Sequence, residues 1–183
     1  MRKEENPIYA HQTIEFVTVA LEYCTMVENI NNINQFDFIN KAIKILPLLY
    51  LKATLLPQIE VIEDIELEQA VTENMYESVR VQIAELLGNK DSFLETFHTD
   101  IQYSDTPIIS FISENLSDVY QDIGNFIFLF RQGNEEIMRN AIALCFNNFQ
   151  KFWGQQLLNA LKALHATFYN DEEFLDINEE TKE

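Results

Sequence analysis

Three carboxylates recur at a spacing of four residues in the last third of the chain: Glu114, Asp118 and Asp122. Residues four apart lie on one face of an α-helix in successive turns, and helical bundles hold hard cations or two-metal centres with carboxylates placed in this way. An exposed acidic face is the alternative, because like charges at this spacing cost only about 0.2–0.5 kcal/mol per pair. The three acids would then be solvated or would pair with Arg131, Arg139 or Lys162.

His165 is the second candidate, because it alone among the three histidines lies in a strongly periodic helical segment. Trp153 and Lys162 occur in the same segment and could border a pocket with it. A buried imidazole hydrogen-bonded to Asp118 or Asp122 is the structural interpretation, and a ligand or general-base role is the functional one. The candidate pocket therefore contains six residues, with no catalytic residue, metal or cofactor assigned: Glu114, Asp118, Asp122, Trp153, Lys162 and His165.

Sequence motifs with a known mechanism do not identify a reaction. The chain has no phosphate loop, nucleophile elbow or metal-ligand spacing. Neither Cys24 nor Cys145 has a histidine at a sequence spacing that indicates a catalytic pair. Glu60 and Glu63 resemble the paired glutamates of all-α nucleoside-triphosphate pyrophosphohydrolases, but the match is poor because those enzymes need two such motifs on helices. Whether the chain is an enzyme stays open.

The charge balance narrows the class of partner. Twelve Lys and Arg against 30 Asp and Glu give a formal charge of −18, which repels phosphate backbones and anionic membranes. We therefore expect no nucleic acid or membrane partner. The most hydrophobic run, Ile45 to Leu51, falls well short of the ~20 apolar residues of a bilayer span. The start of the chain lacks the apolar region of a signal peptide. We expect both cysteines to be free and buried, which suits a reducing cytoplasm.

Composition favours an all-α single domain. The 183 residues are 47% hydrophobic and include only four Gly and four Pro, whereas sheet proteins need many turn residues. We predict a bundle of about six to eight helices with a long C-terminal helix. The helical domain spans residues 1–170, and residues 171–183 form an acidic, disordered tail.

Capping residues and periodicity place the individual helices. The first runs from about Pro7 to Glu28. Asp37 caps the second, which kinks or splits near Leu46 because of Pro47, and residues 58–71 form a solvated acidic connection. We predict a helix from Thr72 to Gly88, a short helical turn from Asp91 to His98, and an irregular link over 99–107. The central helix follows, with Ser110 or Ser113 as its cap, and ends before Gly133. Its segment Phe126–Phe130 is apolar on every side, as in a helix that other helices surround. From Asn134 the pattern gives one long helix, or two with a break near Trp153.

Four segments together resemble a bacterial family of small helical proteins whose domain has no known function. They are Phe16–Cys24, Leu46–Tyr50 with Leu56-Pro57, Leu116–Ile123, and Trp153-Gly154 leading to Ala160–His165. The resemblance implies a helical cytoplasmic protein and supplies no activity. Relatives often carry histidine beside the Trp-Gly pair, where this chain has Phe152 and Gln156, so a metal site built there would be lost.

These observations favour a soluble cytoplasmic helical module that binds an unknown protein or small-molecule partner, because no catalytic constellation stands out. The alternative is a metal-dependent hydrolase or small-ligand-binding protein that uses the carboxylate and histidine pocket. The oligomeric state is open.

Overall fold

The computed structural model describes residues 6–61, 67–95, 108–170 and 174. Six α-helices dominate this part of the chain, which confirms the all-α prediction. They are α1 (His11–Glu28), α2 (Gln35–Thr54), α3 (Glu73–Leu87), α4 (Ile112–Arg131), α5 (Glu135–Asn148) and α6 (Gly154–Asn170). Short 3₁₀ turns follow α1 (Ile30–Asn32) and α3 (Gly88–Lys90), and none of the described helices is long and apolar enough to cross a membrane.

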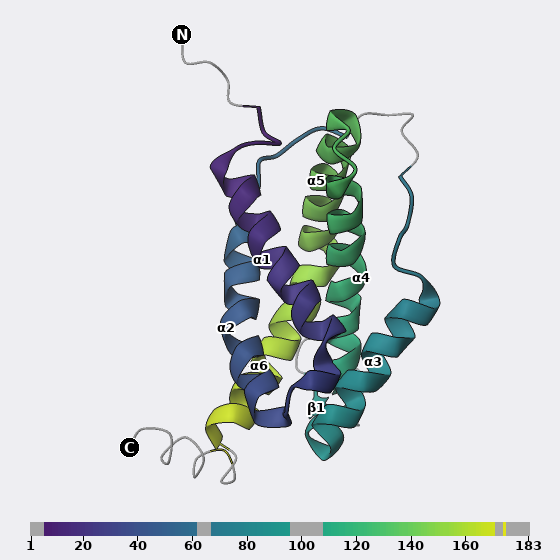
Figure 1. Ribbon diagram of the computed structural model, residues 1–183. Coiled ribbons are helices and arrows are strands. Elements are labelled where there is room, and N and C mark those ends of the chain that lie inside the picture. Colours follow the sequence, from purple (N-terminus) through teal and green to yellow (C-terminus); the bar gives the residue numbers. More distant parts are fainter. Residues whose placement is uncertain (1–5, 62–66, 96–107, 171–173, 175–183) are drawn as a thin grey trace.

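Helix α4 lies at the centre of the bundle, where α1, α3, α5 and α6 all pack against it. In Figure 1, α3 lies on one side of α4 and the α1–α2 pair on the other. The rings of Phe16 on α1 and Phe126 on α4 meet at 5.2 Å between centroids. The prediction that Phe126–Phe130 is enclosed on every side is wrong at Phe128, which is 37% exposed at a gap between α1 and α4.

The first helix begins at His11, four residues later than predicted. Asn6 and Pro7 form a turn instead, because the backbone oxygen of Asn6 accepts from the amide of Tyr9 at 3.0 Å and its side chain accepts from the amide of Ile8 at 3.2 Å. A side chain that can bond its own backbone two residues on favours a turn over a helix start.

Helix α2 is capped by Asn34 rather than by Asp37. The amide of Asp37 donates to Asn34 Oδ1 at 2.9 Å and Asn34 Nδ2 donates to Asp37 Oδ2 at 2.8 Å, so the two side chains satisfy each other. The helix does not split at Pro47. Pro47 lacks the amide that would donate to the carbonyl of Ile43, but its ring lies on the exposed face of the helix.

The helical turn predicted from Asp91 is wrong, because β1 (Ser92–Leu94) pairs antiparallel with β2 (Ile109–Phe111). His98 and residues 99–107 lie outside the described part of the chain. Buried Asp91 caps α4 from outside that helix: its two carboxylate oxygens accept from the amide and the hydroxyl of Ser113, each at 2.7 Å. The prediction of a Ser110 or Ser113 cap was therefore wrong, and Ser113 donates to Asp91.

The predictions for the starts of α3 and α5 and for the ends of α3 and α4 are confirmed. Thr72 and Asn134 accept from the first-turn amides of these helices, and Gly88 and Gly133 take positive φ angles of 56° and 72° after α3 and α4. The break predicted near Trp153 is a single π-helical turn, Phe149–Trp153, between α5 and α6. A Cβ at Gly154 would lie 2.5 Å from the carbonyl oxygen of Phe149, so this turn requires glycine.

Phe174 is packed into the domain beyond the end of α6. Its ring is 2% exposed, lies 5.6 Å from that of Phe36, and carries the Lys90 ammonium 4.1 Å above its centroid. The rest of the predicted tail, 171–173 and 175–183, lies outside the described residues. The packed domain therefore includes at least this one position beyond residue 170.

Candidate functional site

The three predicted carboxylates lie on α4 in different surroundings. Glu114 is exposed, whereas Asp118 and Asp122 are half-buried. Tyr76 on α3 donates its hydroxyl to Asp118 at 2.9 Å, and Asn148 on α5 donates Nδ2 to Asp122 at 2.6 Å. Both half-buried acids therefore bond to neutral donors, and neither bonds to Arg131, Arg139 or Lys162 in the described part of the chain.

The other three predicted residues make no hydrogen bond or ion pair with Asp118 or Asp122 in the described part of the chain. Trp153 is fully buried, and its Nε1 donates to the backbone oxygen of Cys145 at 3.0 Å. Lys162 and His165 are exposed on α6, and the His165 ring packs against that of Tyr169, tilted by 49° with 4.7 Å between the centroids. The predicted buried imidazole is a surface side chain, because Leu161, one turn before it, is already at the half-buried edge of the helix.

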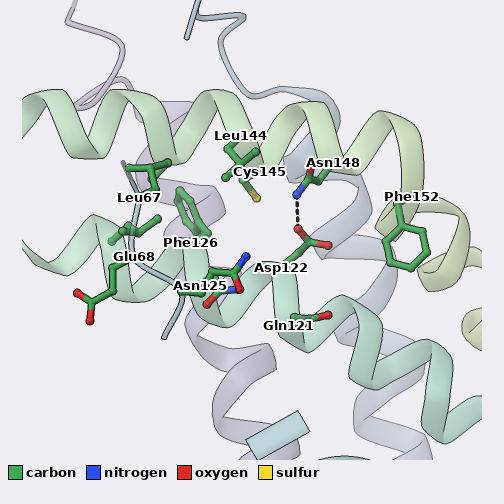
Figure 2. A pocket seen from close by; sticks show the side chains of 13 residues that line it. Leu67, Glu68, Gln121, Asp122, Asn125, Phe126, Leu144, Cys145, Asn148 and Phe152 are labelled. Carbon is green, nitrogen blue, oxygen red and sulfur yellow. Dashed lines mark hydrogen bonds between the residues drawn. The ribbon is translucent and has the colours of Figure 1, made fainter. Parts of the chain in front are cut away.

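Asp122 opens into a cavity of about 300 Å³, which we call the Asp122 cavity. Figure 2 shows α4 and α5 on its two sides, with Asp122 and Asn148 pointing toward one another across it. Its apolar lining is Leu67, Phe126, Leu129, Ala141, Leu144, Cys145 and Phe152, and its polar lining is Glu68, Gln69, Gln121, Asp122, Asn125 and Asn148. A volume of this size is at the lower end of the range for small-molecule sites.

Residues 67–71, which we call the strap, cover one side of the cavity. The amides of Ala70 and Val71 both donate to Asn125 Oδ1, at 2.8 and 2.9 Å. Gly124 allows the close approach, since a Cβ there would lie 2.6 Å from Val71 Cγ2. The acidic connection predicted to be solvated is thus held against α4 over its last residues, while residues 62–66 lie outside the described part.

The π-helical turn forms the opposite end of the cavity. Asn148 is the last residue of α5 before this turn, and Phe152 within it is 44% exposed beside the cavity in Figure 2. Single π turns inside α-helices occur frequently at functional sites. The carbonyl of Cys145, one helical turn earlier, accepts both from the amide of Phe149 and from Trp153 Nε1, so the buried indole ties the end of the π-helical turn back to α5.

Burial sets the electrostatics of the two half-buried acids. Loss of water raises the pKa of Asp122, and the hydrogen bond from Asn148 opposes that shift. Burial also raises the pKa of Asp118, with Tyr76 opposing and the charges of Glu114 and Asp122 adding to the rise. Asp118 lines a neighbouring, more open cavity that shares Gln69 and Gln121 with the first. A cation at either carboxylate would offset the cost of its burial.

Metal ligation has little geometric basis here. Among the residues that the structure describes, no group of three or more His, Cys, Asp or Glu side chains could hold a metal ion. The structure instead surrounds the half-buried carboxylate of Asp122 mainly with amide and apolar side chains, with the exposed Glu68 as the second acid of the lining, and such a lining suits an organic ligand.

Sequence reasoning missed Asn125, Asn148 and the strap. Asn148 is 26 positions from Asp122, so no local spacing connects them. The one signal was amide side chains inside strongly apolar helical runs, as at Asn125 before Phe126 and Asn148 before Phe149.

The fold and the cavity define a helical bundle with a ligand-sized, partly apolar cavity beside its central helix. Residues 7–170 match the family Domain of unknown function (DUF5063), and the chain belongs to this family. It is similar to protein BF1032 from Bacteroides fragilis, a Northeast Structural Genomics Consortium crystal structure. The two are 41% identical with a TM-score of 0.81, over 91% of this chain and 98% of that one. No curated protein matches.

Proposed function

We propose that the protein is a cytoplasmic binding module that holds a small organic cation, such as a primary ammonium group on an apolar body, in the Asp122 cavity. The observation that carries the proposal is a half-buried carboxylate in a partly apolar cavity, bonded only to the neutral donor Asn148 among the described residues. Carboxylates in such surroundings gain most from a charged donor, because charge-assisted hydrogen bonds are roughly twice as strong as neutral ones.

The lining supports an ammonium group attached to an apolar body. The carboxylate can accept from the ammonium, and the amide oxygens of Gln121 and Gln69 supply further acceptors near it. Phe126 and Phe152 present aromatic rings, which attract cations at their faces. The formal charge of −18 adds a long-range attraction for cations.

The cytoplasmic part of the proposal is supported by the two cysteines. Cys24 and Cys145 are both free and buried, and burial raises the pKa of Cys24 to about 12. Thiols in this state are unreactive and persist in a reducing compartment. The metal-dependent hydrolase alternative has no comparable support, because His165 lies on the surface and the described residues supply no ligand cluster.

Titration calorimetry with benzylamine, benzyl alcohol and benzoate tests the proposal with one ring and three head groups. We expect benzylamine to bind, and the alcohol and the acid to bind at least about tenfold more weakly, the equivalent of 1.4 kcal/mol. Asp122→Asn should remove this preference. Glu114→Gln, which neutralises the exposed acid on the same helix, should leave it unchanged. Equal binding of all three compounds, or loss of preference in both variants, would show that the Asp122 carboxylate does not select the ligand.

A further inference from the structure

A second surface, separate from the Asp122 cavity, lies along the outer side of α2. Leu48, Leu51 and Leu55 are 48%, 50% and 48% exposed. Their spacing of three and four residues places Leu48 and Leu51 in one row on α2, which Leu55 continues directly after the helix and exposed Lys44 continues one turn earlier. We call these four residues the α2 row.

The row faces outward because α2 is packed by α1 on one flank and α6 on the other. Figure 1 shows α2 at the edge of the bundle. Helices α2 and α6 are antiparallel: Phe36 near the start of α2 stacks on Phe168 near the end of α6, and Tyr50 near the end of α2 meets Phe149 just before α6. These contacts account for the buried faces of α2 and leave the row uncovered by the described part of the chain.

The charge of this side differs from that of the whole protein. Helices α1, α2 and α6 together contain four lysines and four acids, Glu15, Glu22, Glu28 and Asp37, so this side is close to neutral while the chain carries −18. Lys41 and Lys52 pair with Glu22 and Glu15 on α1, at 3.6 and 2.9 Å. Lys44 has no ion-pair partner among the described residues, so its charge is available beside the leucines.

We propose that the α2 row docks an acidic amphipathic helix of a partner protein, with leucines against its apolar face and Lys44 beside its acids. Helix-in-groove recognition uses anchors at this three-and-four spacing. A second copy docked row to row would place Lys44 near Lys44 or against apolar surface, and an anionic membrane is disfavoured by the net charge. An acidic helix complements both the apolar and the basic parts of the row.

Fluorescence anisotropy with the full-length protein and two synthetic 18-residue helical peptides tests the proposal. One peptide carries leucines in a row flanked by glutamates, and the other replaces every glutamate with lysine. We expect the glutamate peptide to bind at least about tenfold more tightly, although the charge of −18 alone would favour the lysine peptide. Tighter or equal binding of the lysine peptide would overturn the proposal.

Substitutions in the α2 row test whether the peptide binds at this surface. Leu48→Gln with Leu51→Gln should weaken the glutamate peptide at least about tenfold, and Lys44→Glu should weaken it several-fold. Val81→Gln, a matched change at a 41% exposed position on α3, should have no effect. Equal losses in all variants would contradict the docking site. If the native chain self-associates and the leucine variants do not, the row binds a second copy of this chain and the proposed partner helix is wrong. If the row binds phosphatidylglycerol vesicles, its partner is a membrane.

Discussion

Asn148 donates a hydrogen bond of 2.6 Å to Asp122 and so joins the end of α5 to the middle of α4 across the cavity. The donor is neutral, so it orients the carboxylate without cancelling its charge. Burial raises the pKa of Asp122 more strongly than this bond lowers it. The charged form of Asp122 therefore lowers the stability of the folded chain, as is common for side chains that serve in binding.

This cost predicts a pH-dependent effect of Asp122→Asn. A carboxyl with a higher pKa in the folded than in the unfolded chain stabilises the fold below its unfolded-state pKa, and loses that contribution as pH rises through the folded-state pKa. We expect Asp122→Asn to be more stable than the native chain near pH 7, since asparagine can still accept from Asn148, and to have no such advantage near pH 3. Urea unfolding at both pH values measures the difference.

The control is Glu60→Gln, which removes one charge from an exposed residue outside the helices. It should show little difference from the native chain at either pH, because this side chain is exposed to solvent. If both variants gain equally near pH 7, relief of the overall negative charge is the cause and the burial of Asp122 is not.

Gly154→Ala should destabilise the protein, against the usual trend for helices. Alanine in a helix interior is normally better than glycine by up to about 1 kcal/mol. Here the added Cβ would lie 2.5 Å from the carbonyl oxygen of Phe149, so we expect a loss of roughly 1–3 kcal/mol in the free energy of unfolding. Chemical denaturation measures it, with exposed Gln155→Ala expected within about 0.5 kcal/mol of native. A stabilised Gly154→Ala would contradict the π-helical turn.

Asn125→Ala should release the strap. The substitution removes the acceptor of the Ala70 and Val71 amides, so hydrogen exchange at these two amides should become faster and the fold should lose about 1–3 kcal/mol for two hydrogen bonds. Gln121→Ala is the matched control, because Gln121 lines the same cavity and makes no hydrogen bond with the strap among the described residues. Unchanged exchange in Asn125→Ala would contradict the strap's attachment.

Divalent metal ions should not stabilise the protein through Asp118 and Asp122. We expect Mg²⁺, Mn²⁺ and Zn²⁺ to shift the melting temperature of the native chain no more than that of the double variant Asp118→Asn, Asp122→Asn. Thermal melts with and without each ion make the comparison. A rise confined to the native chain would restore the metal-site interpretation of the acidic stripe.

The parts of the fold that could be predicted are those decided by adjacent residues. Thr72 and Gly88 mark the ends of α3 because a side-chain cap and a positive φ angle act within one turn. The cap of α4 could not be predicted in this way, since Asp91 reaches Ser113 from 22 positions earlier.

In the candidate site too, only the features decided by residues close in the sequence could be predicted. The four-residue spacing correctly grouped Asp118 and Asp122 on one side of α4, but it could not supply Tyr76 and Asn148, which come from other helices. His165 was predicted to be buried because the hydrophobic periodicity shows which side of a helix faces the core, but it does not show where the buried face ends. Leu161 stands at that edge, and His165 falls outside it.

The most direct test of the Asp122 cavity is the pKa of the Asp122 carboxyl, followed by carbon-13 NMR with and without benzylamine. We expect a pKa above the ordinary 3.8 in the free protein and a clear fall when benzylamine saturates the site, because a bound ammonium favours the charged carboxylate. Benzyl alcohol at the same concentration should cause no such fall. If benzylamine leaves the pKa of Asp122 unchanged, this carboxylate does not hold the ammonium group of an organic cation.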